Sequence, residues 1–495
     1  CDRAKLACDA LGKRYVSGFN WYSPDMRDDL EKQQYILTNL DRAIGEGWIQ
    51  VYYQPIVSSD TKKPVKMEAL ARWIDPVRGF LSPGEFIPAL EESKLIYKLD
   101  LYVLERVLEK MKQQTEAGFY LVPQSINLSR MDFESCDVVE EIRRRVDDAG
   151  IDRSMITVEI TESVIGENFE FMKAQVERFR ELGFPVWMDD FGSGYSSLDV
   201  LQQIHFDLIK FDMRFMERFD EGDESRIILT ELMNMAIGLG METVCEGVEQ
   251  PEQVEFLREI GCTRIQGYYF GKPLPFEGIL ALIEKGTTLE YENPAESEYY
   301  ATIGRINLCD LTAISNENDD TLSQYFNTLP MCIIEVNGNK ARYNRCNRSY
   351  RDFIQRTMGM SYDTREIDCE DLSGKPGESY FRAVFQCSRG GSTGILDEKV
   401  NENTVAHTLI RRVAINPVTG TVAIAVAVLA VVREGGDAGT SYSQMARAMA
   451  ADYVELYYVS LDTEQYIQYS PDSEREDLAM ERHGEDFFAE ARRQA

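Results

Sequence analysis

Eight short apolar segments lie between residues 48 and 270, and longer amphipathic stretches separate most of them. In chain order the segments are IQVYYQPIV, KMEALARW, SINLS, TVEITE, PVWMDDF, LIKFD, ETVCEGVE and RIQGYYF. The stretches between them, such as KLDLYVLERVLEKMKQQTEAG, have helical spacing and end in glycine. Alternating strands and helices indicate a parallel sheet, and eight repeats predict an α/β fold of the (β/α)8 TIM-like barrel type. A doubly wound open sheet is the alternative architecture.

The chain has 495 residues, too many for one ordinary core, so two or three domains are expected. Residues 286–320 are acidic and lack sustained periodicity, which indicates a linker. Residues 321–435 contain short β-rich runs with Asn-Gly and Thr-Gly turn signals, which predict a smaller α+β domain. The pattern of residues 436–495 predicts a helix and then a hairpin around LDTEQ. We interpret this segment as the start of a further sensory or helical unit.

The charge of the chain limits its partners. It has 84 acidic and 53 basic residues, a net charge of −31. This balance argues against binding a nucleic-acid polymer or an anionic membrane, and a small anionic ligand would need local cations. The longest apolar run, VAIAVAVLAVV at residues 422–432, is much shorter than the ~20 residues of a membrane span and predicts a buried strand.

The ends and the cysteines point to an intracellular fragment. The chain starts at Cys1 without Met and shows no signal peptide, so we interpret it as a cytoplasmic part of a longer protein, in which a membrane tether would lie outside this fragment. Ten scattered cysteines without a CxxC pair indicate reduced thiols. Because the three histidines lie far apart, we expect oxygen atoms to hold any metal.

Polar residues gather where the predicted strands end, which is the face that carries barrel active sites. They are Glu68, Arg72, Asn127, Glu159, Glu162, Asp189, Asp190, Lys210, Glu246, Glu249 and Gln266. Each alone is explained as a rim residue, a helix cap, a turn residue or an exposed lysine. Acidic groups that converge from several strands repel one another unless cations join them, which favours Mg²⁺ or Mn²⁺ with Ca²⁺ as a competitor. The aromatic Tyr52, Tyr53 and Trp73 are expected in the core.

The segment WMDDFGSGYSS sets two aspartates side by side at a strand end. Neighbouring side chains on a strand point to opposite faces. We expect the pleat to give way to a loop after Asp189, so that Asp189 and Asp190 both reach the mouth of the barrel. The glycines then allow a tight turn.

From about residue 30 to 285 the chain resembles the EAL family of cyclic di-GMP phosphodiesterases. The name-giving triplet is Glu68-Ala69-Leu70, and the motifs YYQPIV, EALARW, FIPALEES, INLS, EITES, DDFGSGYSSL, IKFD, EGVE and QGYYFGKPLP follow in family order. The resemblance implies a barrel over residues 28–285 that hydrolyses cyclic di-GMP to linear pGpG in bacterial signalling. The alternative is a receptor or scaffold that binds cyclic di-GMP without turnover.

The resemblance also implies roles for single residues. Two Mg²⁺ or Mn²⁺ ions are expected per site, with Ca²⁺ inhibitory, and a homodimer is expected through this domain. One ion would be bound by Glu68, Asn127, Glu159 and Asp189, and the other by Asp189, Asp190 and Glu246. Lys210 corresponds to the lysine beside the attacking water, Arg72 to a phosphate-binding arginine, and Gln54 and Gln266 to glutamines that contact substrate or water. Glu162 corresponds to the glutamate that anchors the loop 191–198.

The flanking segments resemble signalling domains more loosely. Residues 1–27 resemble the C-terminal end of a GGDEF domain, and residues 321–435 resemble a PAS-type sensor; plain structural or dimerising modules are the alternative. Cys245 stands where the EAL family usually has Ala. An inert buried thiol is the interpretation we favour there over an oxidation-sensitive one.

Overall fold

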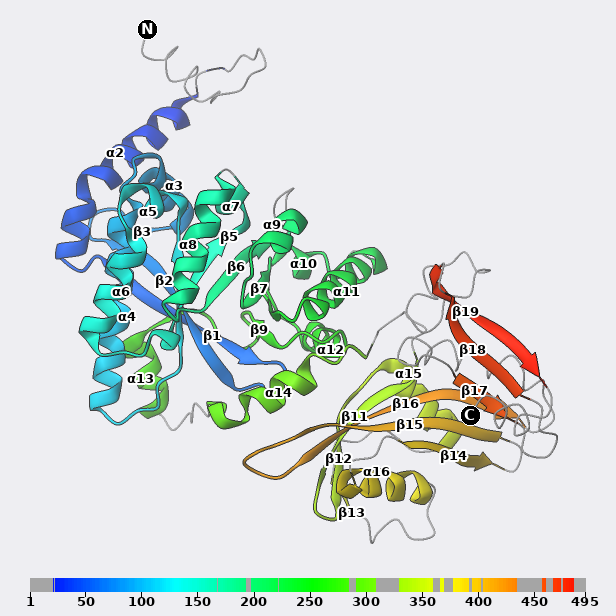
Figure 1. Ribbon diagram of the computed structural model, residues 1–495. Helices are drawn as coiled ribbons and strands as arrows, with labels where there is room; N and C mark the ends of the chain where they lie inside the picture. Colours follow the sequence, from blue (N-terminus) through cyan, green and yellow to red (C-terminus); the bar gives the residue numbers. More distant parts are fainter. Residues whose placement is uncertain are drawn as a thin grey trace.

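The structure is a computed structural model. It describes residues 21, 23–166, 168–192, 197–220, 222–284, 291–308, 329–358, 366–368, 377–390, 394–401, 404–433, 456–459, 466–472 and 475–484. These residues form a closed barrel, a six-stranded sheet with its helices, and a separate three-stranded sheet (Figure 1). In this part of the chain, no helix is both long and apolar enough to cross a membrane.

The predicted barrel is confirmed, because all eight apolar segments supply its strands. The strands are β1 (Ile49–Ser58), β2 (Pro64–Asp75), β4 (Gln124–Leu128), β5 (Ile156–Thr161), β6 (Val186–Phe191), β7 (Leu208–Phe211), β8 (Glu242–Cys245) and β9 (Arg264–Gln266). They pair in chain order, and β9 pairs back to β1, so the sheet is closed and not doubly wound. The short strands β3 (Gly79–Leu81) and β10 (Leu274–Pro275) extend this sheet.

One strand departs from the expected parallel arrangement. β1 is antiparallel to both of its neighbours, β2 and β9. The reason is the connection at residues 59–63, which makes a hairpin. A parallel crossover needs a dozen or more residues.

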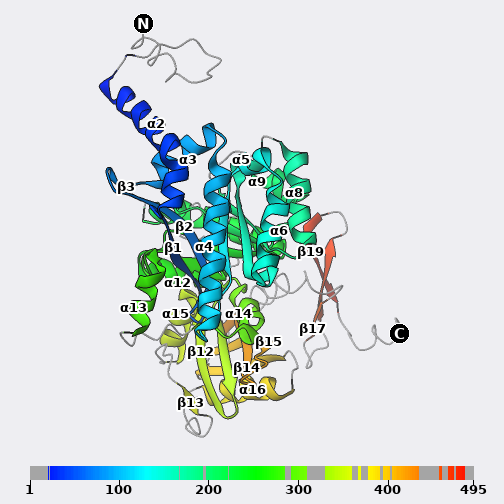
Figure 2. The same ribbon diagram turned by 90° about the vertical axis from the view of Figure 1, so that its left-hand side faces the viewer.

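Helices cover the outside of the barrel (Figure 2). They are α2 (Pro24–Gly45), α3 (Pro83–Glu92), α4 (Ile96–Glu116), α5 (Arg130–Ser135), α6 (Val138–Ala149), α7 (Glu162–Gly166), α8 (Phe169–Glu181), α9 (Ser197–Gln203), α10 (Arg214–Glu217), α11 (Asp223–Gly238), α12 (Pro251–Glu259) and α13 (Phe276–Glu284), with a 3-10 turn η1 (Arg153–Met155). In α4 the buried residues Leu104, Val107, Leu108 and Met111 form one stripe at helical spacing. This stripe faces the sheet and explains why the segment folds as a helix here.

The interior of the barrel is layered. Its N-terminal half is filled by the buried side chains of Ile56, Trp187, Leu208 and Val244. Beside them lies Lys66, and burial lowers its pKa to about 7. The C-terminal half is polar and carries the candidate active site. Of the three aromatic residues expected in the core, Tyr53 and Trp73 are buried and Tyr52 is half-buried.

The C-terminal module is an α+β unit, as predicted. It contains β11 (Met331–Asn337), β12 (Lys340–Cys346), α15 (Arg348–Met358), β13 (Ile367–Asp368), α16 (Glu378–Gly390), β14 (Gly394–Asn401), β15 (Thr404–Ile415) and β16 (Val422–Arg433). The antiparallel sheet has the order β13-β12-β11-β16-β15-β14. The apolar run at 422–432 forms β16 in the middle of this sheet, and its residues Ala423, Ile424, Val426, Ala427 and Val428 are buried, as expected.

The predicted linker contains ordered structure. Within residues 286–320 the chain forms η2 (Pro294–Glu296) and α14 (Ser297–Gly304). Tyr299, Ile303 and Leu308 are buried against Ile333 and Ala423 of the C-terminal sheet. An eight-residue helix is too short to leave a sustained sequence period, which explains why the sequence did not indicate it.

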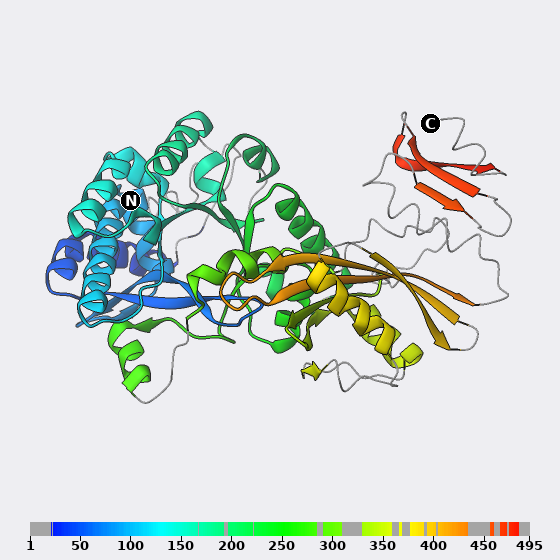
Figure 3. The same cartoon turned by 60° about the horizontal axis from the view of Figure 1, so that its bottom comes forward.

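The two ends of the chain are described only in part. Residues 1–20 lie outside the described residues, as do those of the helix predicted after residue 436. β17 (Leu456–Val459), β18 (Tyr466–Asp472) and β19 (Arg475–Gly484) form an antiparallel sheet, and β17 and β18 pair across the predicted hairpin. In Figure 3 this sheet (red) stands apart from the barrel and from the C-terminal module.

Candidate active site

A buried lysine lies at the centre of the polar half of the barrel. Lys210, on β7, is only 1% exposed. Its Nζ lies 2.7 Å from Glu159 Oε2, 2.7 Å from Glu246 Oε1, 3.1 Å from Asp189 Oδ1 and 3.6 Å from Glu68 Oε2. One ammonium group therefore contacts carboxylates that come from four other strands or strand ends.

Parallel register brings these side chains to one level. Asn127 on β4 lies opposite Glu159 on β5, and Thr161 on β5 lies opposite Asp189 on β6. Because strand side chains alternate between faces, Glu159 and Asp189 both point into the barrel near its C-terminal mouth.

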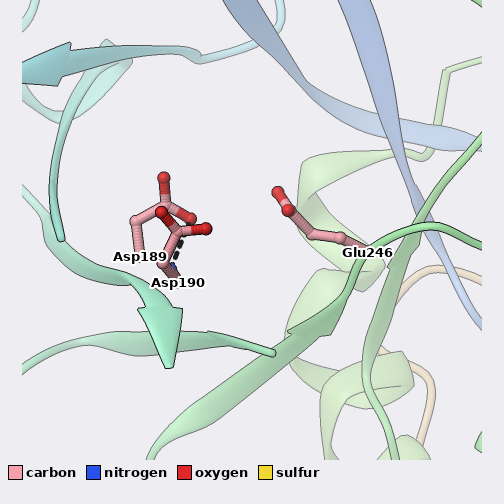
Figure 4. A group of neighbouring side chains, drawn as sticks. All are labelled: Asp189, Asp190 and Glu246. Carbon is pink, nitrogen blue, oxygen red and sulfur yellow. Dashed lines mark hydrogen bonds between the residues drawn. The ribbon is translucent and has the colours of Figure 1, made fainter. Parts of the chain in front are cut away.

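A left-handed residue explains how two adjacent aspartates serve one site. Asp190 has a φ of +54°, and the pairing of β6 with β7 shifts register between Met188 and Phe191. The Asp190 backbone N–H donates to Asp189 Oδ1 at 2.9 Å. Figure 4 shows both aspartate carboxylates on the same side of β6, with Glu246 pointing toward them from across the barrel mouth. The pleat is thus broken inside the strand by a conformation that Asp tolerates better than most residues.

Oxygen atoms in this cluster are close enough to share a metal ion. Asp189, Asp190 and Glu246 each offer one carboxylate oxygen, and these atoms lie within 4.8 Å of one another. Glu159 Oε1 is buried and finds no hydrogen-bond donor among the described residues. An oxygen-only donor set with an unsatisfied buried oxygen fits a hard divalent cation.

The pKa values of the clustered carboxyl groups also favour binding of a cation. Burial raises the pKa of Glu159 to about 8 and that of Glu246 to about 8, although Lys210 opposes both shifts. Burial, with Asp189 next, raises the pKa of Asp190 to about 6. For Lys210, burial lowers the pKa, but the surrounding carboxylates outweigh it and hold the pKa well above its usual value. The single ammonium stays charged and does not fully compensate the acids around it.

The barrel region matches a known family. Residues 38–273 match the EAL domain. These residues are an EAL domain.

The relatives of the chain share this region. The oxygen sensor protein DosP of Escherichia coli is 32% identical over 276 residues, 56% of this chain and 34% of that relative. The cyclic di-GMP phosphodiesterase NbdA of Pseudomonas aeruginosa is 33% identical over 240 residues, 48% of this chain and 31% of that relative. A solved structure of the PaMucR phosphodiesterase in complex with c-di-GMP has 28% identity and a TM-score of 0.47, over 50% of this chain and 99% of that one. The chain spans about a third of the length of the two curated relatives.

In the EAL domain, two side-chain amides hold Glu68, and a third amide holds one of these two. Asn127 Nδ2 donates to Glu68 Oε1 at 2.9 Å, and Gln266 Nε2 donates to Glu68 Oε2 at 2.6 Å. Gln266 also donates to Gln54 Oε1 at 3.3 Å, and Gln54 donates to the carbonyl of Gly271 at 3.2 Å. Burial raises the pKa of Glu68, but Lys210, Gln266 and Asn127 outweigh it and lower the pKa overall. The contacts of Gln54 and Gln266 favour positioning of Glu68, a role that sequence reasoning did not assign to them.

Arg72 of the EAL domain lies outside the carboxylate cluster. It is on β2, four residues beyond Glu68 and therefore on the same strand face, nearer the mouth. Its Nη1 donates to the backbone carbonyl of Ala71 at 2.8 Å, and its guanidinium carbon lies 5.9 Å from the ring centroid of Tyr52. The half-buried side chain thus provides a positive charge at the rim.

Glu162 holds the start of the loop that follows β6. It is the first residue of α7 and is buried. Its Oε2 accepts a hydrogen bond from the backbone N–H of Gly192 at 3.2 Å. Gly192 has a φ of +91°, and a Cβ there would lie 2.8 Å from the ring of Phe215. Residues 193–196, at the tip of the expected loop, lie outside the described residues.

Two residues named in the sequence analysis, Glu249 and Cys245, are not part of the carboxylate cluster. Glu249 is exposed, and its backbone N–H donates to Gln253 Oε1 at 2.8 Å. Cys245 is fully buried, and burial raises the pKa of its thiol well above the usual value. This environment favours the inert thiol.

Asp212 is a neighbour of the site that sequence reasoning missed. It lies two residues after Lys210 and forms a 2.9 Å ion pair with Arg214 Nε. After burial and Asp189, its negative charge is the next largest cause of the raised pKa of Asp190. The motif IKFD contains the signal, because its final acid follows a strand-end lysine.

Proposed function

We propose that this EAL domain hydrolyses cyclic di-GMP to linear pGpG with two divalent cations, Mg²⁺ or Mn²⁺. The observation that carries the proposal is the cluster of five acidic side chains around Lys210, three of which offer oxygens within 4.8 Å of one another. The relative named as a cyclic di-GMP phosphodiesterase supports the choice of substrate. Ca²⁺ is proposed to inhibit, because it accepts looser coordination than Mg²⁺.

The proposed ligands divide into two sets that share Asp189. The first set is Glu68, Asn127, Glu159 and Asp189, and the second is Asp189, Asp190 and Glu246. Bound divalent cations activate water for attack on phosphorus and neutralise charge on the phosphoryl oxygens. The unsatisfied Oε1 of Glu159 and the raised pKa values of Glu159 and Glu246 support these assignments.

The chain's own cations complete the site. Lys210 remains an ammonium at neutral pH because its pKa is held well above the usual value, so it positions the carboxylates and the attacking water and does not accept a proton. Arg72 adds positive charge at the rim, where a second phosphate of a cyclic dinucleotide would lie. In the reaction, water forms a new bond to phosphorus as the bond to the ribose O3′ breaks; the water gives up a proton, and O3′ leaves as a hydroxyl group.

A hydrolysis assay tests the proposal. The protein is incubated with cyclic di-GMP and either Mg²⁺ or Mn²⁺, and pGpG is measured by liquid chromatography. We expect turnover that Glu68→Ala lowers by at least about 100-fold, since the variant loses a ligand. Glu249→Ala, a matched change at an exposed acid, should keep the wild-type rate. Binding of cyclic di-GMP without product in either metal would instead support the receptor or scaffold.

We also propose that the flanking parts regulate the EAL domain. Residues 321–435 would be a PAS-like sensor, and residues 1–27 would be the remnant of a GGDEF domain. The EAL domain would form the homodimer contact. The contacts of the C-terminal module support regulation. Arg345 Nη1 donates to the carbonyl of Arg258 at 2.6 Å, and Arg351 Nη2 lies 2.7 Å from Glu259 Oε1. Both acceptors are on α12, the helix between the strand that precedes Glu246 and the strand that carries Gln266.

A further inference from the structure

Two cavities lie at the N-terminal end of the barrel, opposite the candidate active site. The first has a volume of about 260 Å³ and lies between the barrel and the segment that contains η2 and α14. The second has a volume of about 380 Å³ and lies beside α8 and the start of β6. Three residues line both cavities: Lys66, Glu242 and Arg264.

Lys66 differs from the other cations at this end of the barrel. Arg264 Nη2 lies 2.5 Å from Glu242 Oε2, and Arg180 Nη2 lies 3.7 Å from Asp207 Oδ1. Lys66 is 6% exposed, and no carboxylate among the described residues lies within 4.0 Å of its Nζ. A buried ammonium without an anionic partner is costly.

The surroundings of Lys66 compensate its charge only in part, because Glu159, Glu242 and Asp207 act on it from beyond 4.0 Å and burial and Arg264 oppose them. Its Nζ donates to the hydroxyl of Thr157 and lies 4.0 Å from the ring centroid of Trp187. A hydroxyl and an aromatic face stabilise an ammonium only partly. The nearby Glu292 is already held, since it accepts from Thr61 at 2.7 Å and from Ser297 at 3.1 Å.

The other walls of the smaller cavity are apolar and aromatic. They include Tyr120, Leu121, Met155, Pro294 and Tyr300. We propose that this cavity binds a small aromatic carboxylate, with the carboxylate on Lys66 and the ring against these walls. Apolar walls with one charged anchor are the usual composition of a small-molecule site.

The position of the cavity links its occupant to both halves of the protein. Pro294, Ser297 and Ala301 form part of its wall and belong to η2 and α14, the segment that packs on the C-terminal sheet. Within the barrel, Lys66 lies two residues before Glu68 on the same strand face, roughly 7 Å along the strand. The bound carboxylate would therefore contact the connection to the C-terminal module and lie one layer below the site proposed for catalysis.

Calorimetric titration of the full chain tests the proposal, without divalent cations or cyclic di-GMP, so the result is independent of the proposed phosphodiesterase activity. The probes are benzoate and benzamide, which share a shape and differ in charge. We expect saturable benzoate binding and at least about tenfold weaker benzamide binding, since only benzoate pairs with an ammonium. Absence of saturable benzoate binding, or equal affinity for the two probes, would overturn the proposal.

Variants locate the site. Lys66→Met removes the charge and keeps the length of the side chain, and it should weaken benzoate binding at least about tenfold. Lys112→Met, at an exposed position on α4, should not change it. Ala301→Leu fills the cavity without changing charge and should weaken both probes, which keeps the test decisive even where Lys66→Met fails to fold. Unchanged benzoate binding in Ala301→Leu would refute the location.

Discussion

Binding of a divalent cation to the EAL domain is expected to release protons, because Glu159 and Glu246 keep theirs at neutral pH. Burial raises the pKa of each to about 8, so a cation must displace a proton from each carboxyl group that is still protonated. The sign follows directly: affinity rises with pH up to about 8 and then levels off. Lys210 adds nothing to this dependence, since its pKa lies well above the range.

The size of the effect follows from the number of protons. Each displaced proton lowers the apparent affinity about tenfold for each pH unit below the pKa. If both glutamates must ionise, the affinity for Mn²⁺ falls by roughly 30-fold between pH 8 and pH 7, because each group is already half protonated at pH 8. The two groups interact through Lys210 and titrate as a unit, so the total is expected to be spread over a wider range of pH.

Isothermal titration of Mn²⁺ at several pH values measures this directly. Repeating each titration in two buffers of different ionisation enthalpy gives the number of protons released. Glu246→Gln should lower that number by about one, whereas Glu249→Gln, at an exposed acid, should leave it unchanged. An affinity that stays constant between pH 6.5 and 8.5, with no proton release, would refute the reasoning.

Three further outcomes follow from single contacts. Lys210→Met removes the ammonium shared by four carboxylates and should lower the free energy of unfolding by about 3–5 kcal/mol without metal, measured by urea denaturation at neutral pH; an unchanged midpoint contradicts it. Gly267→Ala places a Cβ 2.0 Å from the Val248 carbonyl oxygen and should destabilise by more than about 2 kcal/mol, whereas Gly278→Ala, whose nearest neighbour is 3.4 Å away, should not. Arg345→Met removes hydrogen bonds to backbone carbonyls on α12 and α14, and amide hydrogen exchange should rise in both helices; unchanged protection there would show that the contact is dispensable.

Sequence reasoning found the barrel because each strand is a separate apolar run between helices, and a closed parallel sheet is the fold that accommodates eight such repeats. It found the acidic residues because the C-terminal ends of the barrel strands lie at one face of the barrel. The reversed direction of β1 was missed, although the short connection at residues 59–63 already excludes a crossover helix.

Other features depend on contacts that sequence position does not reveal. The left-handed backbone of Asp190 coincides with the register shift against β7, a pairing that forms only in the folded sheet. Gln54 and Gln266 lie 212 residues apart, and their shared contact near Glu68 exists only once the barrel closes. Lys66, next to apolar residues in VKMEAL, has the same pattern as an exposed strand lysine, and only the closed sheet places it inside.

The hairpin formed by β1 and β2 runs the full height of the barrel. Midway along the ladder, Gln54 pairs opposite Glu68 beside the carboxylate cluster. At one end its turn touches the opposite face, where Ser59 N–H donates to the carbonyl of Thr263 at 3.0 Å and Thr61 donates to Glu292 at 2.7 Å. If a helix connected β1 to β2 in place of this turn, a loop would lie at each end of that helix, between the two strands. The β1–β2 ladder, with a register shift between Ile56 and Val57, instead joins the turn beside Glu292 to Glu68 through one hydrogen-bonded pair of strands.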